Sequence, residues 1–240
     1  ETDEMALNSY GAESLAGLPE TRVFYLELPE KPSADRLARQ IALAGEAGFN
    51  ALAIPFFSKG FSIHHSDVCK GIGLPLCRPD LMRDEELLDL LFEAADAHTL
   101  KVYALASPFS AGDEAYHWDA RYPFFRRGHR LAARNKLLEL HPLGNTSHER
   151  FLCLNNPETR HFAADLMVEI AETYPVSALV MDIANYPFSA DVPENNACFC
   201  RFCKKEVAEE IQIDLNTLPL DPSDTAFRIW NRWKNARCYD

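Results

Sequence analysis

Short apolar runs alternate with amphipathic stretches through most of the 240-residue chain. Runs of this length and composition are typical of strands buried on both faces. Between them, apolar residues recur at helical spacing, as in Leu88, Leu91 and Ala95. The pattern predicts four strands, the first apolar enough to be central in a sheet, at residues 22–28 (RVFYLEL), 50–57 (NALAIPFF), 101–106 (KVYALA) and 178–182 (ALVMD).

Helix boundaries are marked by residues that favour helix ends. Ser33 is a suitable N-cap for a first helix, and Asn156-Pro157-Glu158 combines an N-cap, an N1 proline and a first-turn acid. Pro175 ends that later helix. We expect further helices over residues 84–97 and 204–211, and a last one that follows an Asp221-Pro222 cap and packs through Trp230 and Trp233.

The strand–helix alternation, without a hairpin signal, predicts parallel strands joined by right-handed crossovers. An open doubly wound sheet and half of an eight-stranded barrel both fit this order. No G-x-G-x-x-G motif follows the first strand, and long loops, expected over residues 58–83 and 107–150, follow the second and third strands. We therefore predict an α/β fold of the (β/α)8 TIM-barrel type with only about the first four βα units present.

These units set the expected domain organisation. Residues 1–20 are expected to be an irregular lead-in, and residues 21–240 the N-terminal half of the barrel. Four units leave the first and last strands with unpaired edges, so self-association is expected. The chain begins with Glu1 and shows no secretory leader, which leaves its compartment unassigned.

The charge and hydropathy of the chain argue against some classes of binding partner. A net charge of −12 disfavours binding to phosphate backbones, so we expect no nucleic-acid partner. No apolar run approaches the ~20 residues that a membrane span needs. Seven cysteines in 240 residues are too few for a disulfide scaffold. Cys198, Cys200 and Cys203 nevertheless form a tight C-x-C-x-x-C triplet, a spacing that favours a metal site or local disulfides.

Several stretches resemble the glycosyl-hydrolase-like family 10 of barrel proteins. The likeness spans residues 22–237, and Asp182, Tyr186 and Pro187 match the end of that family's fourth strand, where Ile183 and Asn185 replace a tyrosine and an arginine. Ser177 and Ala178 replace an Asp-Gly pair at its start. The matching segments are GFNALAIP (48–55), KVYALASPF (101–109), LNNPETRHFAADLMVEIAETYPVSALVMDIANYP (154–187) and DPSDTAFRIWNRWKNAR (221–237).

The cysteine triplet is similar to that of family 42 β-galactosidases, in which a triplet plus one earlier cysteine can hold zinc. Cys153, within FLCLNNP, matches that earlier position. The resemblance therefore implies a closed, structural zinc site formed by Cys153, Cys198, Cys200 and Cys203, with a reduced thiol cluster or local disulfides as the alternative. The Asn-Glu pair that supplies that family's general acid is absent, because Ala184-Asn185 is not followed by a glutamate.

Asp182 is the candidate catalytic residue, because a carboxylate that ends a buried strand lies where α/β enzymes place reactive groups. It would act as general acid/base or nucleophile in glycoside cleavage; the alternative is a helix-capping or salt-bridging acid, paired with Arg121 or Arg201. The residues expected to bind carbohydrate are Glu27, His64, His117, Trp118 and Tyr186. For Glu27, a structural ion pair is an equal alternative.

The implied function is hydrolysis of O-glycosidic bonds in an oligo- or polysaccharide. The alternative is a non-catalytic carbohydrate-binding or structural barrel that keeps the zinc. A second carboxylate at the end of another strand would distinguish the two, because glycoside hydrolysis uses a pair of carboxyl groups.

Overall fold

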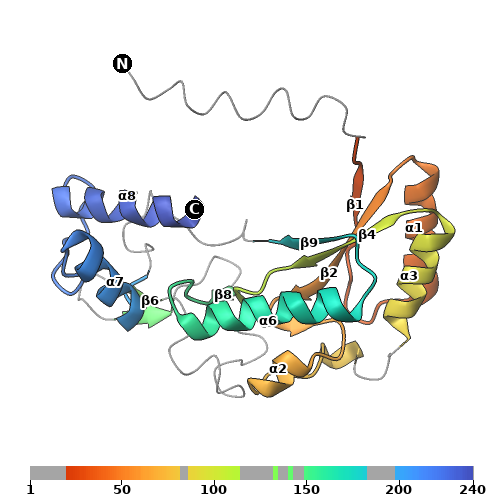
Figure 1. The fold of residues 1–240 in the computed structure, drawn as a ribbon, viewed down its shortest axis with the longest axis horizontal. Coiled ribbons are helices and arrows are strands. Elements are labelled where there is room, and N and C mark those ends of the chain that lie inside the picture. The colour runs from red at the N-terminus through yellow and green to blue at the C-terminus, as the bar shows by residue number, and fades with distance from the viewer. Residues whose placement is uncertain are drawn as a thin grey trace.

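A parallel β-sheet forms the centre of the protein (Figure 1). The computed structural model describes residues 20–81, 86–113, 132–134, 140–142, 149–182 and 198–239. In this part of the chain the sheet has the spatial order β1-β2-β4-β9, with all three neighbouring pairs parallel. The predicted α/β fold with a parallel sheet is confirmed. The strands are β1 (Val23–Tyr25), β2 (Ala51–Ser58), β4 (Lys101–Ala106) and β9 (Ala178–Met181).

The spatial order of these strands repeats their order along the chain. A doubly wound sheet would show a reversal at its switch point, and none occurs among the described strands. The order is therefore that of consecutive βα units in a (β/α)8 barrel. Three helices connect the strands: α1 (Ala34–Glu46), α3 (Leu87–Ala97) and α6 (Pro157–Thr173). Ser33 and Asn156 cap α1 and α6 as predicted, since their side chains accept from Arg36 N and Glu158 N.

The central strand β2 is almost fully buried, with seven of its eight residues buried. Pro55 cannot donate to the ladder, and the register with β4 shifts between Pro55 and Phe57. Successive residues of a regular strand point to opposite faces. After this irregularity, Phe56 contacts Phe92 of α3 while Phe57 contacts Phe162 of α6. Consecutive aromatic side chains thus anchor two different helices.

The outer strands are less buried than the sequence predicted. β1 was expected to be central, yet it lies at the edge of the described sheet, and Tyr25 is 54% exposed. β9 was expected to be buried on both faces, yet Leu179, Val180 and Met181 are 38–44% exposed. Both expectations are wrong, because β1 and β9 are the outer strands of the described sheet and their faces are covered less fully than those of β2.

The segment after β2, expected to be a loop, contains β3 (Phe61–Ser62), α2 (Asp67–Gly71) and the short 3-10 helix η1 (Pro79–Leu81). β3 pairs antiparallel with the end of β2. The region between β4 and α6 also contains strands, which pair antiparallel as β5 (Ser110–Asp113) with β8 (Glu149–Phe151) and β6 (Ala132–Arg134) with β7 (Leu140–Pro142).

Helices α7 (Arg201–Ile211) and α8 (Thr225–Tyr239) form a second, smaller core at the opposite end of the molecule from α1 and α3 (Figure 1). Trp230 is 1% exposed and packs on Phe199 and Phe227, as expected of a packing residue. Trp233 donates from Nε1 to Glu210 Oε2 at 2.7 Å. Among the described residues, no helix is both long and apolar enough to cross a membrane.

The N-cap of α8 differs from the prediction. Asp224 Oδ1 accepts from the backbone N–H groups of Ala226 and Phe227, at 2.8 and 3.1 Å. Asp221 instead accepts from the backbone and the hydroxyl of Ser223, which makes a separate turn before the helix. Both aspartates are of the residue type that caps helices. Asp224 is the N-cap because it directly precedes the first turn of α8.

We predict that Asp224→Ala lowers the free energy of unfolding by about 1 kcal/mol, because two N–H groups of the first turn of α8 lose their acceptor. Asp221→Ala is the matched control and should have a smaller effect. Urea unfolding followed by the fluorescence of Trp230 and Trp233 measures both. Equal effects of the two variants would contradict the assignment of Asp224 as the cap.

Candidate functional site

Asp182 lies where the sequence placed it, directly after the last residue of β9. Its backbone N–H donates to Ala106 O at 2.8 Å, so its pairing with β4 continues to the strand end. Ser107, which follows β4, donates from Oγ to Asp182 Oδ2 at 3.4 Å. Because the carboxyl ends of parallel strands meet at one edge of the sheet, the two polar side chains are neighbours there.

Tyr25, the last residue of β1, interacts electrostatically with Asp182. Burial raises the pKa of Tyr25, and the negative charges of Glu27 and Asp182 raise it further. The sequence pointed to Asp182 and Glu27 but missed Tyr25 and Ser107. Their position at the ends of apolar runs was the available signal.

Other predicted residues cannot be placed with these four. His117, Trp118 and Tyr186 lie outside the described residues, as does Arg121. The carbohydrate-binding roles of His117, Trp118 and Tyr186 therefore remain predictions, as does the alternative ion pair of Asp182 with Arg121.

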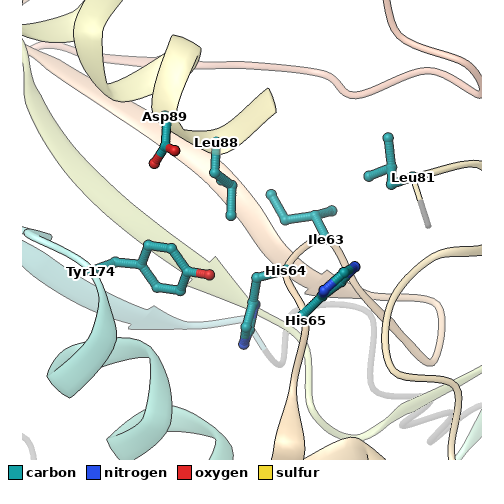
Figure 2. Close-up of a pocket in the computed structure, with 7 residues that line it drawn as sticks. All are labelled: Ile63, His64, His65, Leu81, Leu88, Asp89 and Tyr174. Atoms are coloured by element: carbon teal, nitrogen blue, oxygen red, sulfur yellow. The ribbon is translucent and has the colours of Figure 1, made fainter. Parts of the chain in front are cut away.

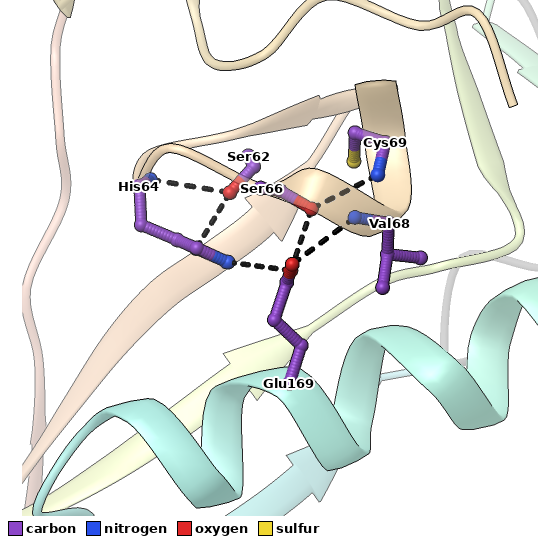
Figure 3. Close-up of polar contacts among 6 residues, drawn as sticks. All are labelled: Ser62, His64, Ser66, Val68, Cys69 and Glu169. Carbon is purple, nitrogen blue, oxygen red and sulfur yellow. Dashed lines mark hydrogen bonds and ion pairs between the residues drawn. The ribbon is translucent and has the colours of Figure 1, made fainter. Parts of the chain in front are cut away.

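His64, also expected to bind carbohydrate, is 3% exposed and has both ring nitrogens occupied (Figure 3). Ser62 Oγ lies 2.6 Å from His64 Nδ1, and Glu169 Oε2 lies 3.0 Å from His64 Nε2. Glu169 projects from α6, so this contact joins the segment after β3 to a helix more than 100 residues later. No ring nitrogen remains for a sugar hydroxyl, and the geometry supports a structural role for His64.

Glu169 is the acceptor at the centre of this network. Ser66 Oγ donates to Glu169 Oε2 at 2.6 Å, and the backbone N–H of Val68 donates to Oε1 at 3.1 Å. Burial opposes ionisation, but the hydrogen bonds from Ser66, Val68 and His64 outweigh it and lower the Glu169 pKa. The sequence signal for Glu169 was weak: it lies three residues after Leu166, at the border of the apolar face of α6.

The four predicted cysteines meet in the smaller core. Sulfur atoms of Cys153, Cys198, Cys200 and Cys203 all lie within 4.8 Å of one another, and all four side chains are buried. Cys153 Sγ lies 3.5 Å from the sulfurs of both Cys200 and Cys203. A disulfide needs ~2.05 Å, so these cysteines are free thiols. Four sulfurs around one zinc ion, each at ~2.3 Å in tetrahedral geometry, would lie ~3.8 Å apart.

The surroundings of the cluster favour negatively charged sulfur. α7 begins directly after Cys200, and helix N-termini stabilise thiolates. Hydrogen-bond contacts with Cys153, Cys198 and Cys203 lower the Cys200 pKa, whereas contacts within the cluster raise the pKa of Cys153 and Cys203. Asn155 Nδ2 also donates to Cys203 Sγ at 3.3 Å. The four cysteines could hold a metal ion, and a four-thiolate donor set is compatible with structural zinc.

No protein-family model and no curated protein matches this sequence. Solved structures align with it at low identity. A hypothetical protein from Ruminiclostridium thermocellum is 14% identical with a TM-score of 0.47, covering 70% of this chain and 78% of that one. A noncanonic maltogenic α-amylase from Thermotoga neapolitana is 11% identical with a TM-score of 0.44, covering 70% and 40%. An α-amylase from Lactobacillus plantarum is 11% identical with a TM-score of 0.44, covering 80% and 43%.

This chain spans less than half the length of either amylase. With TM-scores below 0.5, these likenesses carry no argument about activity, and the names describe those proteins alone.

We predict that the folded protein holds about one zinc ion per chain and that Cys200→Ser releases it. The variant should also melt at a lower temperature, because metal binding supplies folding free energy at such sites. Elemental analysis and thermal melting with and without chelator measure both effects. Cys77→Ser, which changes a buried cysteine outside the cluster, is the matched control and should keep the metal. If the well-folded protein is prepared with zinc available and still contains no bound zinc, the site is contradicted.

The His64–Glu169 network predicts a loss of stability in acid. Burial lowers the His64 pKa, more than the contact with Glu169 raises it. The unfolded chain therefore takes up a proton below pH ~6.5 that the folded protein does not, and the free energy of unfolding falls as pH falls through that range. Glu169, with its lowered pKa, adds a further loss below pH ~4.5.

We expect His64→Gln to reduce the slope of unfolding free energy against pH between pH 7 and pH 5.5. Urea unfolding at several pH values measures that slope. Glu169→Gln, which keeps the shape but removes the charge, is the second variant, and His161→Gln, at an exposed position on α6, is the control. An unchanged slope in His64→Gln between pH 7 and pH 5.5, together with an unchanged slope in Glu169→Gln below pH ~4.5, would show that other groups cause the acid sensitivity.

Proposed function

We propose that this chain is the N-terminal half of a barrel glycoside hydrolase that cleaves O-glycosidic bonds in an oligo- or polysaccharide. The observation that carries the proposal is the hydrogen bond from Ser107 to Asp182 at the carboxyl ends of the parallel strands β4 and β9. Reactive groups of (β/α)8 enzymes lie at this end. The sequence resemblance to glycosyl-hydrolase-like family 10 adds the substrate class.

In this proposal Asp182 is the catalytic carboxyl group. It would protonate the leaving oxygen as general acid or attack the sugar as nucleophile. The Ser107 hydroxyl, which donates to it, would hold one carboxylate oxygen in place. Glu27, whose charge raises the pKa of Tyr25, would bind sugar hydroxyl groups together with this tyrosine. The partner carboxylate would come from a later strand of the completed barrel.

Zinc would have a structural role in this protein. Cys153 lies just before α6, while the other three cysteines surround the start of α7. One ion bound by all four would therefore hold the start of α6 to the segment that follows β9 and its Asp182. Because four cysteine ligands fill a tetrahedral site, no coordination position would remain for substrate.

The alternative function is a carbohydrate-binding or structural barrel that keeps the zinc without catalysis. It is favoured by the sequence Ala184-Asn185, which lacks the general-acid glutamate found at this place in family 42 β-galactosidases. Saturable binding of an oligosaccharide without any hydrolysis by the full-length protein would support this alternative over the enzyme.

We predict that Asp182→Asn in the full-length protein lowers kcat by orders of magnitude and leaves zinc content unchanged, because an amide can neither transfer the proton nor attack. Reducing-sugar release from a panel of oligosaccharides measures the rate. Glu27→Gln should mainly raise KM, as expected of a binding residue. Hydrolysis by Asp182→Asn at the parent rate would make Asp182 a structural acid, and a collapse of kcat in Glu27→Gln would make Glu27 the second catalytic carboxylate.

A further inference from the structure

A separate pocket lies between α3, the end of α6 and the segment after β3 (Figure 2). Its cavity volume is about 250 Å³, and we call it the α3–α6 pocket. It shares no residue with the Asp182 neighbourhood or with the cysteine cluster. The proposed glycosidase function does not use this pocket.

The floor of the α3–α6 pocket is apolar. Ile63, Leu81 and Leu88 line it and are only 2–7% exposed. His64 also lines it. Because both of its ring nitrogens are occupied by Ser62 and Glu169, His64 can offer a ligand only its ring surface. The floor therefore suits a hydrocarbon body.

Two polar groups at the pocket are available to a ligand. Within the described part of the chain, neither the Asp89 carboxylate nor the Tyr174 hydroxyl makes a hydrogen bond or an ion pair. Asp89 is exposed, whereas Tyr174 is half-buried and packs its ring on Phe92 and His64. In Figure 2 the Tyr174 hydroxyl points toward the histidines and leucines that line the pocket.

The charges around the pocket select the sign of the ligand. Among the described residues that line it there is no lysine or arginine, Asp89 is the one carboxylate, and His65 is the titratable side chain besides His64 and Tyr174. Burial raises the Tyr174 pKa, and the charges of Glu169 and Asp89 raise it further, so the phenol faces a negative field. Such a site repels anions and attracts cations.

We propose that the α3–α6 pocket binds a small organic cation, a primary ammonium group on a short aliphatic body. The ammonium would donate to the Asp89 carboxylate and to the Tyr174 oxygen, and the carbon chain would lie on Ile63, Leu81 and Leu88. Pockets for drug-sized ligands measure about 300–1,000 Å³, so a cavity of about 250 Å³ suits a smaller molecule.

The test is an NMR titration of the 240-residue protein in amine-free phosphate buffer with three four-carbon probes: n-butylammonium, 1-butanol and butyrate. We expect saturable shifts of the backbone signals of His65, Asp89 and Tyr174 with butylammonium alone. Asp89→Asn should weaken this binding on the order of tenfold, because a charge-assisted bond is lost. Tyr174→Phe should weaken it less. Asp96→Asn, at another exposed position on α3, is the matched control and should bind as the parent does.

Several outcomes would overturn the proposal. Equal binding of butylammonium and butanol would show an apolar cavity without charge selection, and unchanged binding in Asp89→Asn would place the cation elsewhere. Glucose is the fourth probe. Glucose binding that depends on Asp89, without binding of butylammonium, would make the pocket a polyol site. Shifts that never saturate would show that the pocket binds none of these ligands.

Discussion

The parallel pairing of β2 with both β1 and β4 is the constraint on which the rest of the structure depends. A parallel neighbour can be reached only by a crossover, so each connection must bring a helix onto the sheet. The same pairing directs every strand end to one edge. Ser107 and Asp182, which are far apart in the sequence, are neighbours for that reason.

The smaller core depends on a different kind of interaction. Its apolar contacts, centred on Phe199, Phe227 and Trp230, surround four buried thiols. The four sulfur atoms lie within 4.8 Å of one another. A metal ion could be bound by all four sulfurs as thiolates. Bound metal would then add to the apolar contacts that stabilise this smaller core.

The buried network around Glu169 shows why chemical type alone is a weak guide to function. A histidine beside serines and a glutamate has the composition of a catalytic site. Here His64 and Ser62 are buried, and the hydrogen bonds of Glu169 satisfy groups that folding removed from water. The network fastens the segment after β3 to α6. The open pocket beside it offers instead the groups that the network leaves unused, Asp89 and Tyr174.

The sequence by itself determined the features that arise from local periodicity and chemistry. The four strands, the caps at Ser33 and Asn156, the strand-end position of Asp182 and the cysteine spacing could all be read from neighbouring residues. Only the tertiary structure decided which strands lie at edges, which aspartate caps α8, and that Glu169 reaches His64. Those outcomes depend on contacts between residues distant in the chain, because burial and pairing are set by what packs on a side chain and not by its sequence neighbours.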